Sequence, residues 1–283
     1  MLYLVVHIIS ITLFSLCYKA ASTGPRTCHT PLVHLNMYLA AVLAAGTSVF
    51  FLGFIPDLRI TLLGIAGGLC LFAAMRTFFF AMTQGGLAVG WTFVNLSVVI
   101  PLVASIYFWN EIPGPYQVAG LVLILPCIML FGNLDLQVAG NRRRWLVLVF
   151  IASAATGLAQ TVGKAVSVLE FQDRMQLIVN YLLWFYLVGI GLLVGLGGAR
   201  NWKPVSRETG VGLIMGGLNV AGVWSFIKAL ENMEGIVFFP TKTAFNIILT
   251  ALFAVFFWKE EVTKRQVAGI GVGTLAAVFV NLR

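Results

Sequence analysis

Residues 86–120 read GLAVGWTFVNLSVVIPLVASIYFWNEIPGPYQVAG, and residues 235–269 read GIVFFPTKTAFNIILTALFAVFFWKEEVTKRQVAG. A constant offset of 149 residues aligns the two stretches without a gap and pairs Glu111 with Glu260. Each stretch is typical of an apolar helix, a short charged turn and the start of a second apolar helix. An internal repeat of membrane hairpins indicates a secondary transporter with its substrate site between the two repeats.

The composition supports a membrane location. Hydrophobic residues make up 60% of the 283 residues, charged residues make up 10%, and the mean hydropathy is +0.96. A soluble domain of this size has no interior large enough for so much apolar surface. Because the core of a bilayer requires about 20 apolar residues per helix, the chain has room for roughly ten spans.

Ten apolar stretches divide the chain into two sets of five. The stretches cover residues 2–18, 33–54, 60–82, 86–108, 115–132, 145–166, 177–197, 209–230, 235–257 and 264–281. The first repeat is expected at 1–132, a basic connector at 133–144, and the second repeat at 145–283. An odd number of spans per repeat inserts the second copy upside down. We therefore predict an all-α membrane protein of ten transmembrane helices in two inverted five-helix repeats around a central cavity.

Several other classes of protein are not indicated. The net charge of +8 comes mostly from scattered loop residues, which suit lipid head groups and topology better than nucleic acid. Four cysteines and three histidines form no cluster with metal-ligand spacing, so neither a metal nor a cofactor is expected. A membrane enzyme or an assembly scaffold is an alternative to a transporter. The sequence has no paired acids, His-rich motif or Gly-X-Ser-X-Gly element that would support an enzyme.

The repeated turn also carries a family resemblance. Phe108-Trp109-Asn110-Glu111 with Gly120, and Phe257-Trp258-Lys259-Glu260 with Gly269, resemble the repeated motif of the drug/metabolite transporter superfamily, and most closely its EamA-type ten-helix members. The resemblance implies a central cavity walled largely by the third, fourth, eighth and ninth helices, with the fifth and tenth at the periphery. It leaves the substrate open, because the superfamily moves amino acids, sugars, nucleotide sugars, sugar phosphates and drugs.

Two basic residues lie well inside predicted spans. Arg76 is about six residues from the end of the third stretch, and Lys242 is about seven residues from the start of the ninth. At about 1.5 Å per residue, each lies roughly 10 Å inside the hydrocarbon, where a charge normally faces a polar cavity. No acidic residue occupies the middle of a span, and the first stretch carries His7, for which a packing role is expected.

Polar side chains concentrate on the paired helices. The candidate substrate-binding residues are Lys242, Arg76, Trp91, Asn95, Thr92, Thr241, Asn246, Asn219 and Trp224, and Gln160 and Asn180 are expected to complete the lining. Pro240 offers a bend that gating can use, since it leaves one helix carbonyl unbonded. Structural or gating roles are expected for Glu111 and Glu260, which lie in turns.

Glycines spaced four residues apart predict close helix contacts. The pairs are Gly64/Gly68, Gly191/Gly195, Gly212/Gly216 and Gly269/Gly273. Such stripes let helix backbones approach one another in lipid. The pair on the last helix leaves a homodimer open.

Two transport functions fit these features. The first is a secondary transporter of a small polar, possibly anionic, metabolite that works by alternating access. The second is an exporter of amino acids or of neutral or hydrophobic compounds on the same fold, with Arg76 and Lys242 as structural or gating residues. The lack of an acid in mid-span favours exchange or uniport over ion coupling.

The expected location is the bacterial inner (plasma) membrane, where the partners are a small-molecule substrate and the lipid bilayer. The orientation stays open. With both termini outside, eleven of the 18 lysines and arginines lie on the cytoplasmic side and five on the other. The positive-inside rule favours that orientation, whereas the family resemblance implies that both termini are inside.

Overall fold

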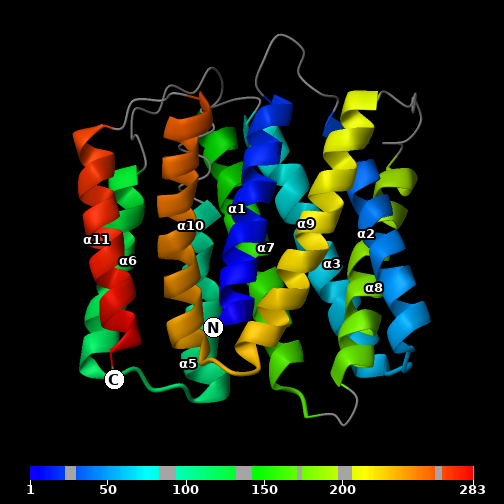
Figure 1. Cartoon of the computed structure of the whole chain (residues 1–283), viewed down its shortest axis with the longest axis horizontal. Helices are drawn as coiled ribbons and strands as arrows, with labels where there is room; N and C mark the ends of the chain where they lie inside the picture. Colours follow the sequence, from blue (N-terminus) through cyan, green and yellow to red (C-terminus); the bar gives the residue numbers. More distant parts are fainter. Residues whose placement is uncertain are drawn as a thin grey trace. The chain divides into compact units, whose positions relative to one another are not determined.

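The computed structural model describes residues 1–22, 30–82, 94–131, 142–170, 174–196, 206–258 and 263–282. Within these ranges the chain forms ten α-helices and one short 3₁₀ helix (Figure 1). In chain order they are α1 (Leu2–Ser22), α2 (Thr30–Leu52), α3 (Leu58–Met82), η1 (Leu96–Val98), α5 (Val99–Trp109), α6 (Pro115–Phe131), α7 (Arg142–Val168), α8 (Arg174–Gly195), α9 (Ser206–Leu230), α10 (Gly235–Trp258) and α11 (Lys264–Asn281).

The helices coincide with the predicted apolar stretches. The described ends agree with the expected ones within four residues, and the fourth stretch is described from residue 94 as η1 and α5. By length and hydropathy, α2, α3, α7, α8 and α9 each suffice to cross a bilayer, and the other apolar helices are shorter in their described parts. The all-α fold with ten helices is therefore confirmed, whereas the inverted relation of the two repeats stays a prediction.

The described helices group into two compact units. Unit 1 comprises Met1–Phe72 and Val162–Glu231, and unit 2 comprises Ala73–Thr161 and Asn232–Arg283. Each unit therefore combines segments from both halves of the sequence. The predicted boundaries of the sequence repeats, with a connector at 133–144, are a separate division that the packing does not test.

In unit 1, α9 packs against α1, α2 and α8, and α2 packs against α8. Glycines permit the closest of these approaches. A Cβ atom added to Gly212 would lie 2.8 Å from the carbonyl oxygen of Val33, and one added to Gly216 would lie 2.5 Å from that of Met37. The predicted glycine contact on this helix is therefore confirmed.

The other predicted glycine pairs differ in their surroundings. A Cβ atom at Gly64 would lie 2.8 Å from the carbonyl oxygen of Tyr181, so α3 also approaches α8 through a glycine. At Gly191 and Gly195 the same atom would meet nothing within 4 Å. The prediction of close packing by that pair finds no support among the described residues.

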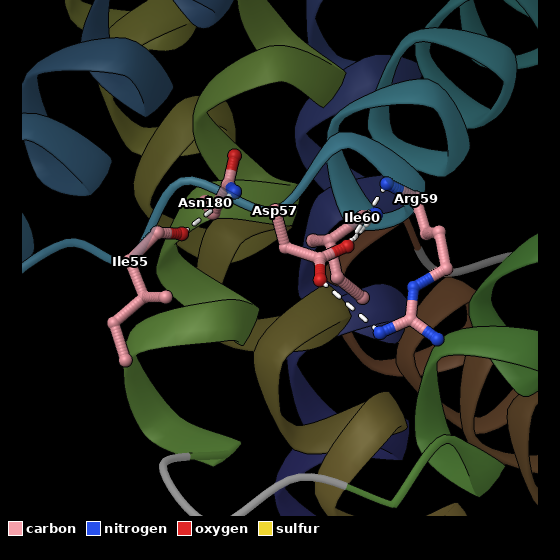
Figure 2. Close-up of polar contacts among 5 residues, drawn as sticks. All are labelled: Ile55, Asp57, Arg59, Ile60 and Asn180. Carbon is pink, nitrogen blue, oxygen red and sulfur yellow. Dashed lines mark hydrogen bonds and ion pairs between the residues drawn. The ribbon is translucent and has the colours of Figure 1, made fainter.

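The loop between α2 and α3 is fixed by hydrogen bonds at both of its ends (Figure 2). Asn180 of α8 donates from Nδ2 to the carbonyl oxygen of Ile55 at 3.0 Å. The Asp57 carboxylate caps α3 by accepting from the backbone N–H groups of Arg59 at 2.9 Å and Ile60 at 3.1 Å. The Ile60 N–H, aided by the Arg59 guanidinium, lowers the pKa of Asp57 below its ordinary value.

In unit 2, α11 lies beside α6, and α10 packs against α5, α6 and α11 (Figure 1). A Cβ atom at Gly120 of α6 would lie 2.8 Å from the carbonyl oxygen of Ala276, and Cys127 Sγ donates to the carbonyl oxygen of Gly269 at 3.4 Å. The 149-residue offset pairs Gly120 with Gly269 and Cys127 with Ala276. Applying the offset to the pair Gly120 and Ala276 therefore gives the pair Gly269 and Cys127. A two-fold axis between α6 and α11 would require this equivalence.

Candidate functional site

The most distinctive polar contact in unit 2 involves Lys242, the one charged residue in the sequence of α10. Its Nζ donates a hydrogen bond to Oε1 of Gln160 on α7 at 2.7 Å. It also lies 5.6 Å from the centre of the Phe239 ring, which is within the range of a cation–π contact. Because Lys242 is two turns from the start of an apolar helix, it is about 10 Å along the helix axis from that end.

The helix α7 brings Gln160 to this position by packing closely on the end of η1 and the start of α5. A Cβ atom at Gly157 would lie 2.8 Å from the carbonyl oxygen of Ser97 and 2.7 Å from Cβ of Ile100. Gln160 follows Gly157 by three residues and therefore lies on a neighbouring part of the same helix face. The glycine fixes the separation of the backbones, and the glutamine side chain then extends to Lys242.

The residues beside Lys242 on α10 have other partners. The Thr241 hydroxyl accepts from Nδ2 of Asn281 on α11 at 3.0 Å, and it is buried. Asn246 Oδ1 accepts from the Thr250 hydroxyl at 3.1 Å, one turn further along α10. Thr241 therefore connects α10 to α11, while the amide of Asn246 makes a local bond within its own helix.

Pro240 lies inside α10 and is buried. Since proline has no N–H, the carbonyl of Ile236 lacks the usual hydrogen bond from the residue four positions later. The first turn of α10 holds a second special contact, in which Glu111 Oε2 accepts from the N–H of Ile236 at 2.9 Å. A carboxylate at a helix N-terminus satisfies an otherwise unbonded donor and complements the helix dipole.

Glu111 reaches α10 because the chain reverses at the end of α5. Asn110 adopts a left-handed conformation with φ of 52°, which ends the helix. The N–H of Glu111 then donates to the carbonyl oxygen of Ser105 at 3.3 Å. Of the two predicted turn carboxylates, Glu111 thus makes a structural contact, whereas Glu260 lies outside the described residues.

Arg76 belongs to the part of α3 that falls in unit 2. Its guanidinium carbon lies 4.9 Å from the centre of the Phe80 ring, one turn further along the helix. Asn95 is half-buried just before η1, and its side chain does not cap that helix. The other two fourth-helix candidates, Trp91 and Thr92, lie outside the described residues.

The two candidates on α9 belong to unit 1. Asn219 is buried and accepts from the Tyr186 hydroxyl on α8 at 2.7 Å. Trp224 packs edge-to-face against Tyr3 of α1, with ring centres 5.4 Å apart. These contacts join α9 to its neighbours in unit 1, so the predicted set is divided between the two units.

Two further residues of unit 1 have packing contacts. His7 Nδ1 lies 2.8 Å from the carbonyl oxygen of Gly222, so the expected packing role for this histidine agrees with its position. Asn180 uses both ends of its amide, donating to Ile55 and accepting from the Thr61 hydroxyl at 3.3 Å. Its side chain therefore anchors the α2–α3 loop.

The contact that sequence reasoning missed is the one between Lys242 and Gln160. Gln160 was expected only as a further lining residue, and nothing in its spacing links it to a lysine 82 residues away. The same is true of Tyr186 and Asn219, which are 33 residues apart. The signal that was available is the polar character of each residue within an apolar span.

Comparison with known proteins identifies the class of this chain. The sequence model of the EamA-like transporter family matches residues 143–282. No curated protein matches the sequence. A solved structure titled "Crystal structure of protein" is similar in fold, with a TM-score of 0.77 and 13% sequence identity over 99% of this chain and 95% of that chain. With its apolar helices and this match, the chain is a membrane protein whose residues 143–282 match the EamA-like transporter family.

Proposed function

We propose that this transporter moves a small polar, anionic metabolite by alternating access, with Lys242 as the residue that attracts the anion. The observation that carries the proposal is the position of Lys242 within an apolar helix, where its ammonium group is bound to a neutral amide of another helix. A charged side chain at this depth is costly, so it normally faces a polar site and is a candidate for a functional role.

The neighbours of Lys242 suit an anion site. Gln160 supplies a neutral acceptor, and Phe239 supplies an aromatic face. An ammonium group has three hydrogens and is a suitable donor for a carboxylate or phosphate. In the predicted alternating-access mechanism, substrate binding here is followed by rearrangement around the start of α10, where Pro240 interrupts the backbone bonding.

The predicted inverted repeat supports the same mechanism. Two related halves of opposite orientation can exchange roles when the site opens to one side of the membrane or the other. The 149-residue sequence offset and the interchangeable contacts of α6 and α11 favour this arrangement.

The proposal is tested by counterflow in proteoliposomes that contain the purified protein. The panel comprises glucose 6-phosphate, succinate, glucose, leucine and tetraphenylphosphonium, which cover phosphorylated, carboxylate, neutral, zwitterionic and lipophilic cationic compounds. Lys242→Met removes the charge but keeps an unbranched side chain of similar length. We expect the wild type to exchange anions and Lys242→Met to lose at least about tenfold in that exchange.

Lys228→Met is the matched control. Lys228 also lies on an apolar helix, but near its end, and it forms an ion pair with Glu231 at 3.0 Å. We expect this variant to keep the anion preference of the wild type. Exchange of leucine or the lipophilic cation that Lys242→Met leaves unchanged would overturn the anion proposal and favour the exporter of amino acids or hydrophobic compounds.

A further inference from the structure

Tyr38 on α2 carries a buried hydroxyl that no other described residue binds. The side chain is fully buried, and its hydroxyl oxygen has no hydrogen-bond partner within the described part of the chain. Buried polar groups are nearly always bonded, because an unpaired one keeps the full cost of leaving water. A phenylalanine would fill the same space without that cost. The contacts within the described chain therefore do not account for the hydroxyl.

The packing of α2 fixes where this hydroxyl lies. The ring of Tyr38 rests on Gly189 of α8, where an added Cβ atom would lie 2.6 Å from Cζ of the ring. On the other neighbour of α2, a Cβ atom at Gly216 of α9 would lie 2.6 Å from Cβ of Ala40. The hydroxyl is therefore held where α2 meets α8 and α9, all within unit 1 (Figure 1).

The surroundings of Tyr38 are polar but uncharged. Tyr186 lies one turn from Gly189 on α8, its ring centre is 6.5 Å from that of Tyr38, and its hydroxyl donates to Asn219 of α9 at 2.7 Å. Both tyrosines and the asparagine lie within about one turn of the middle of their helices. The sequence of α2 has no lysine, arginine or acid, and those of α8 and α9 have them only in the end turns. This position suits a neutral polar partner.

We propose that Tyr38 is a specificity-determining residue whose hydroxyl binds an uncharged hydroxyl group of the substrate, in a site formed by α2, α8 and α9. A phenol and an alcohol each donate and accept, so they can satisfy one another. A site built for a substrate hydroxyl rejects an analogue that lacks it, because the buried group of the site is then left unpaired. Tyr38 meets this condition, since its hydroxyl finds no partner among the described residues.

The inference rests on the proposed function in one respect, which is that the protein binds a small polar substrate and moves it by alternating access. It does not depend on the charge of the substrate or of Lys242. Because Tyr38 is fully buried, its site is closed in this structure. A substrate reaches the hydroxyl when the neighbouring helices move apart, as an alternating-access cycle requires.

Pairs of compounds that differ by one hydroxyl test the selection directly. Malate and succinate form an anionic pair, and serine and alanine form a zwitterionic pair. We expect the wild type to have a half-saturation concentration in counterflow at least about tenfold lower for the hydroxylated member of a transported pair. Tyr38→Phe removes only the hydroxyl and keeps the ring on Gly189, so this ratio should fall to about one.

Thermal unfolding without substrate gives a second readout. Tyr38→Phe should unfold at a temperature no lower than that of the wild type, because no bond within the protein is lost. Tyr186→Phe should unfold at a lower temperature, because its hydroxyl is bonded to Asn219. Tyr107→Phe is the matched control for transport, since Tyr107 lies on α5 in unit 2 and is 77% exposed. This control should keep the wild-type preference for hydroxylated compounds.

The experiment measures counterflow of the four compounds and thermal unfolding for the wild type, Tyr38→Phe and Tyr107→Phe, with Tyr186→Phe in the unfolding series. A preference for serine without exchange of malate would support the role of Tyr38 and overturn the anion proposal, provided that Tyr38→Phe abolishes the preference. A wild type that favours neither hydroxylated compound, including one that exchanges none of the four, would overturn the role of Tyr38. A preference that Tyr38→Phe retains, or a lower unfolding temperature in that variant, would do the same.

Discussion

The contact of α9 with α2 allows a sharp comparison between two neighbouring glycines. Gly216 faces α2, where an added Cβ atom would lie 2.5 Å from the carbonyl oxygen of Met37 and 2.6 Å from Cβ of Ala40. Gly217 is the next residue on the same helix, and an added Cβ atom there would meet nothing within 4 Å. The substitutions Gly216→Ala and Gly217→Ala therefore change the same helix in the same way, apart from this contact.

The size of the effect follows from these distances. Carbon atoms in contact normally lie about 3.5–4.0 Å apart, so the methyl group at Gly216 overlaps α2 by about 1 Å. The overlapping groups belong to the backbone and to Cβ and cannot rotate away. Replacing glycine by alanine in a helix stabilises it by about 1 kcal/mol, whereas overpacking costs about 1–3 kcal/mol. The first term is common to both variants, so Gly216→Ala should be less stable than Gly217→Ala by about 1–3 kcal/mol.

Thermal unfolding in one detergent at one scan rate measures this difference. For a chain of this size, we expect the Gly216→Ala midpoint to lie on the order of 5 °C below that of Gly217→Ala. The larger pair Gly216→Leu and Gly217→Leu should widen the gap. Equal midpoints in both pairs would refute the reasoning, because α2 would then not be held at the distance that the glycine permits.

Three further predictions concern contacts away from Lys242. Glu111→Ala should destabilise the protein by about 0.5–2 kcal/mol, because the N–H of Ile236 loses its cap; thermal unfolding checks this, and an unchanged midpoint would contradict it. Tyr186→Phe should lower the free energy of unfolding by about 1–3 kcal/mol, because the buried side-chain carbonyl of Asn219 loses its donor. Amide hydrogen exchange in α8 and α9 should become faster, and unchanged protection would argue against the bond. The lowered pKa of Asp57 stabilises the folded state at a pH above the ordinary value of 3.8, and this contribution is lost as the pH falls through the folded-state pKa. Asp57→Asn should therefore unfold at a lower temperature than the wild type at pH 7, and the gap should narrow as the pH is lowered below 3.8. A gap that does not narrow would count against the assignment.

Much of the secondary structure could be predicted from the sequence because each helix is determined locally. A run of about 20 apolar residues in a bilayer must satisfy its backbone hydrogen bonds within itself, so its length and hydropathy fix its bounds. The predicted stretch 264–281 coincides with α11, and 115–132 differs from α6 by one residue. The glycines of α9 were also predictable, since a stripe of small residues marks where a backbone can approach.

The candidate site was less predictable, because spacing along a helix gives the direction of a side chain but not its neighbour. Thr241 and Lys242 are adjacent in sequence, yet the first bonds Asn281 of α11 and the second bonds Gln160 of α7. Successive residues on a helix point about 100° apart, so they face different helices. Asn219 and Trp224, which were also predicted to line the substrate site, have contacts within unit 1.

The sequence by itself determined that the chain is a membrane protein with ten helices and a repeat at an offset of 149 residues. It also determined that a basic residue, Lys242, lies within the apolar helix α10. Only the tertiary structure decided that Gln160 is the acceptor for that cation, that Glu111 caps α10, and that each compact unit combines helices from both halves of the chain. The physical reason is the range of the interactions. Hydropathy and backbone bonding act within one helix, whereas a side-chain hydrogen bond across 82 residues of sequence depends on how the helices pack.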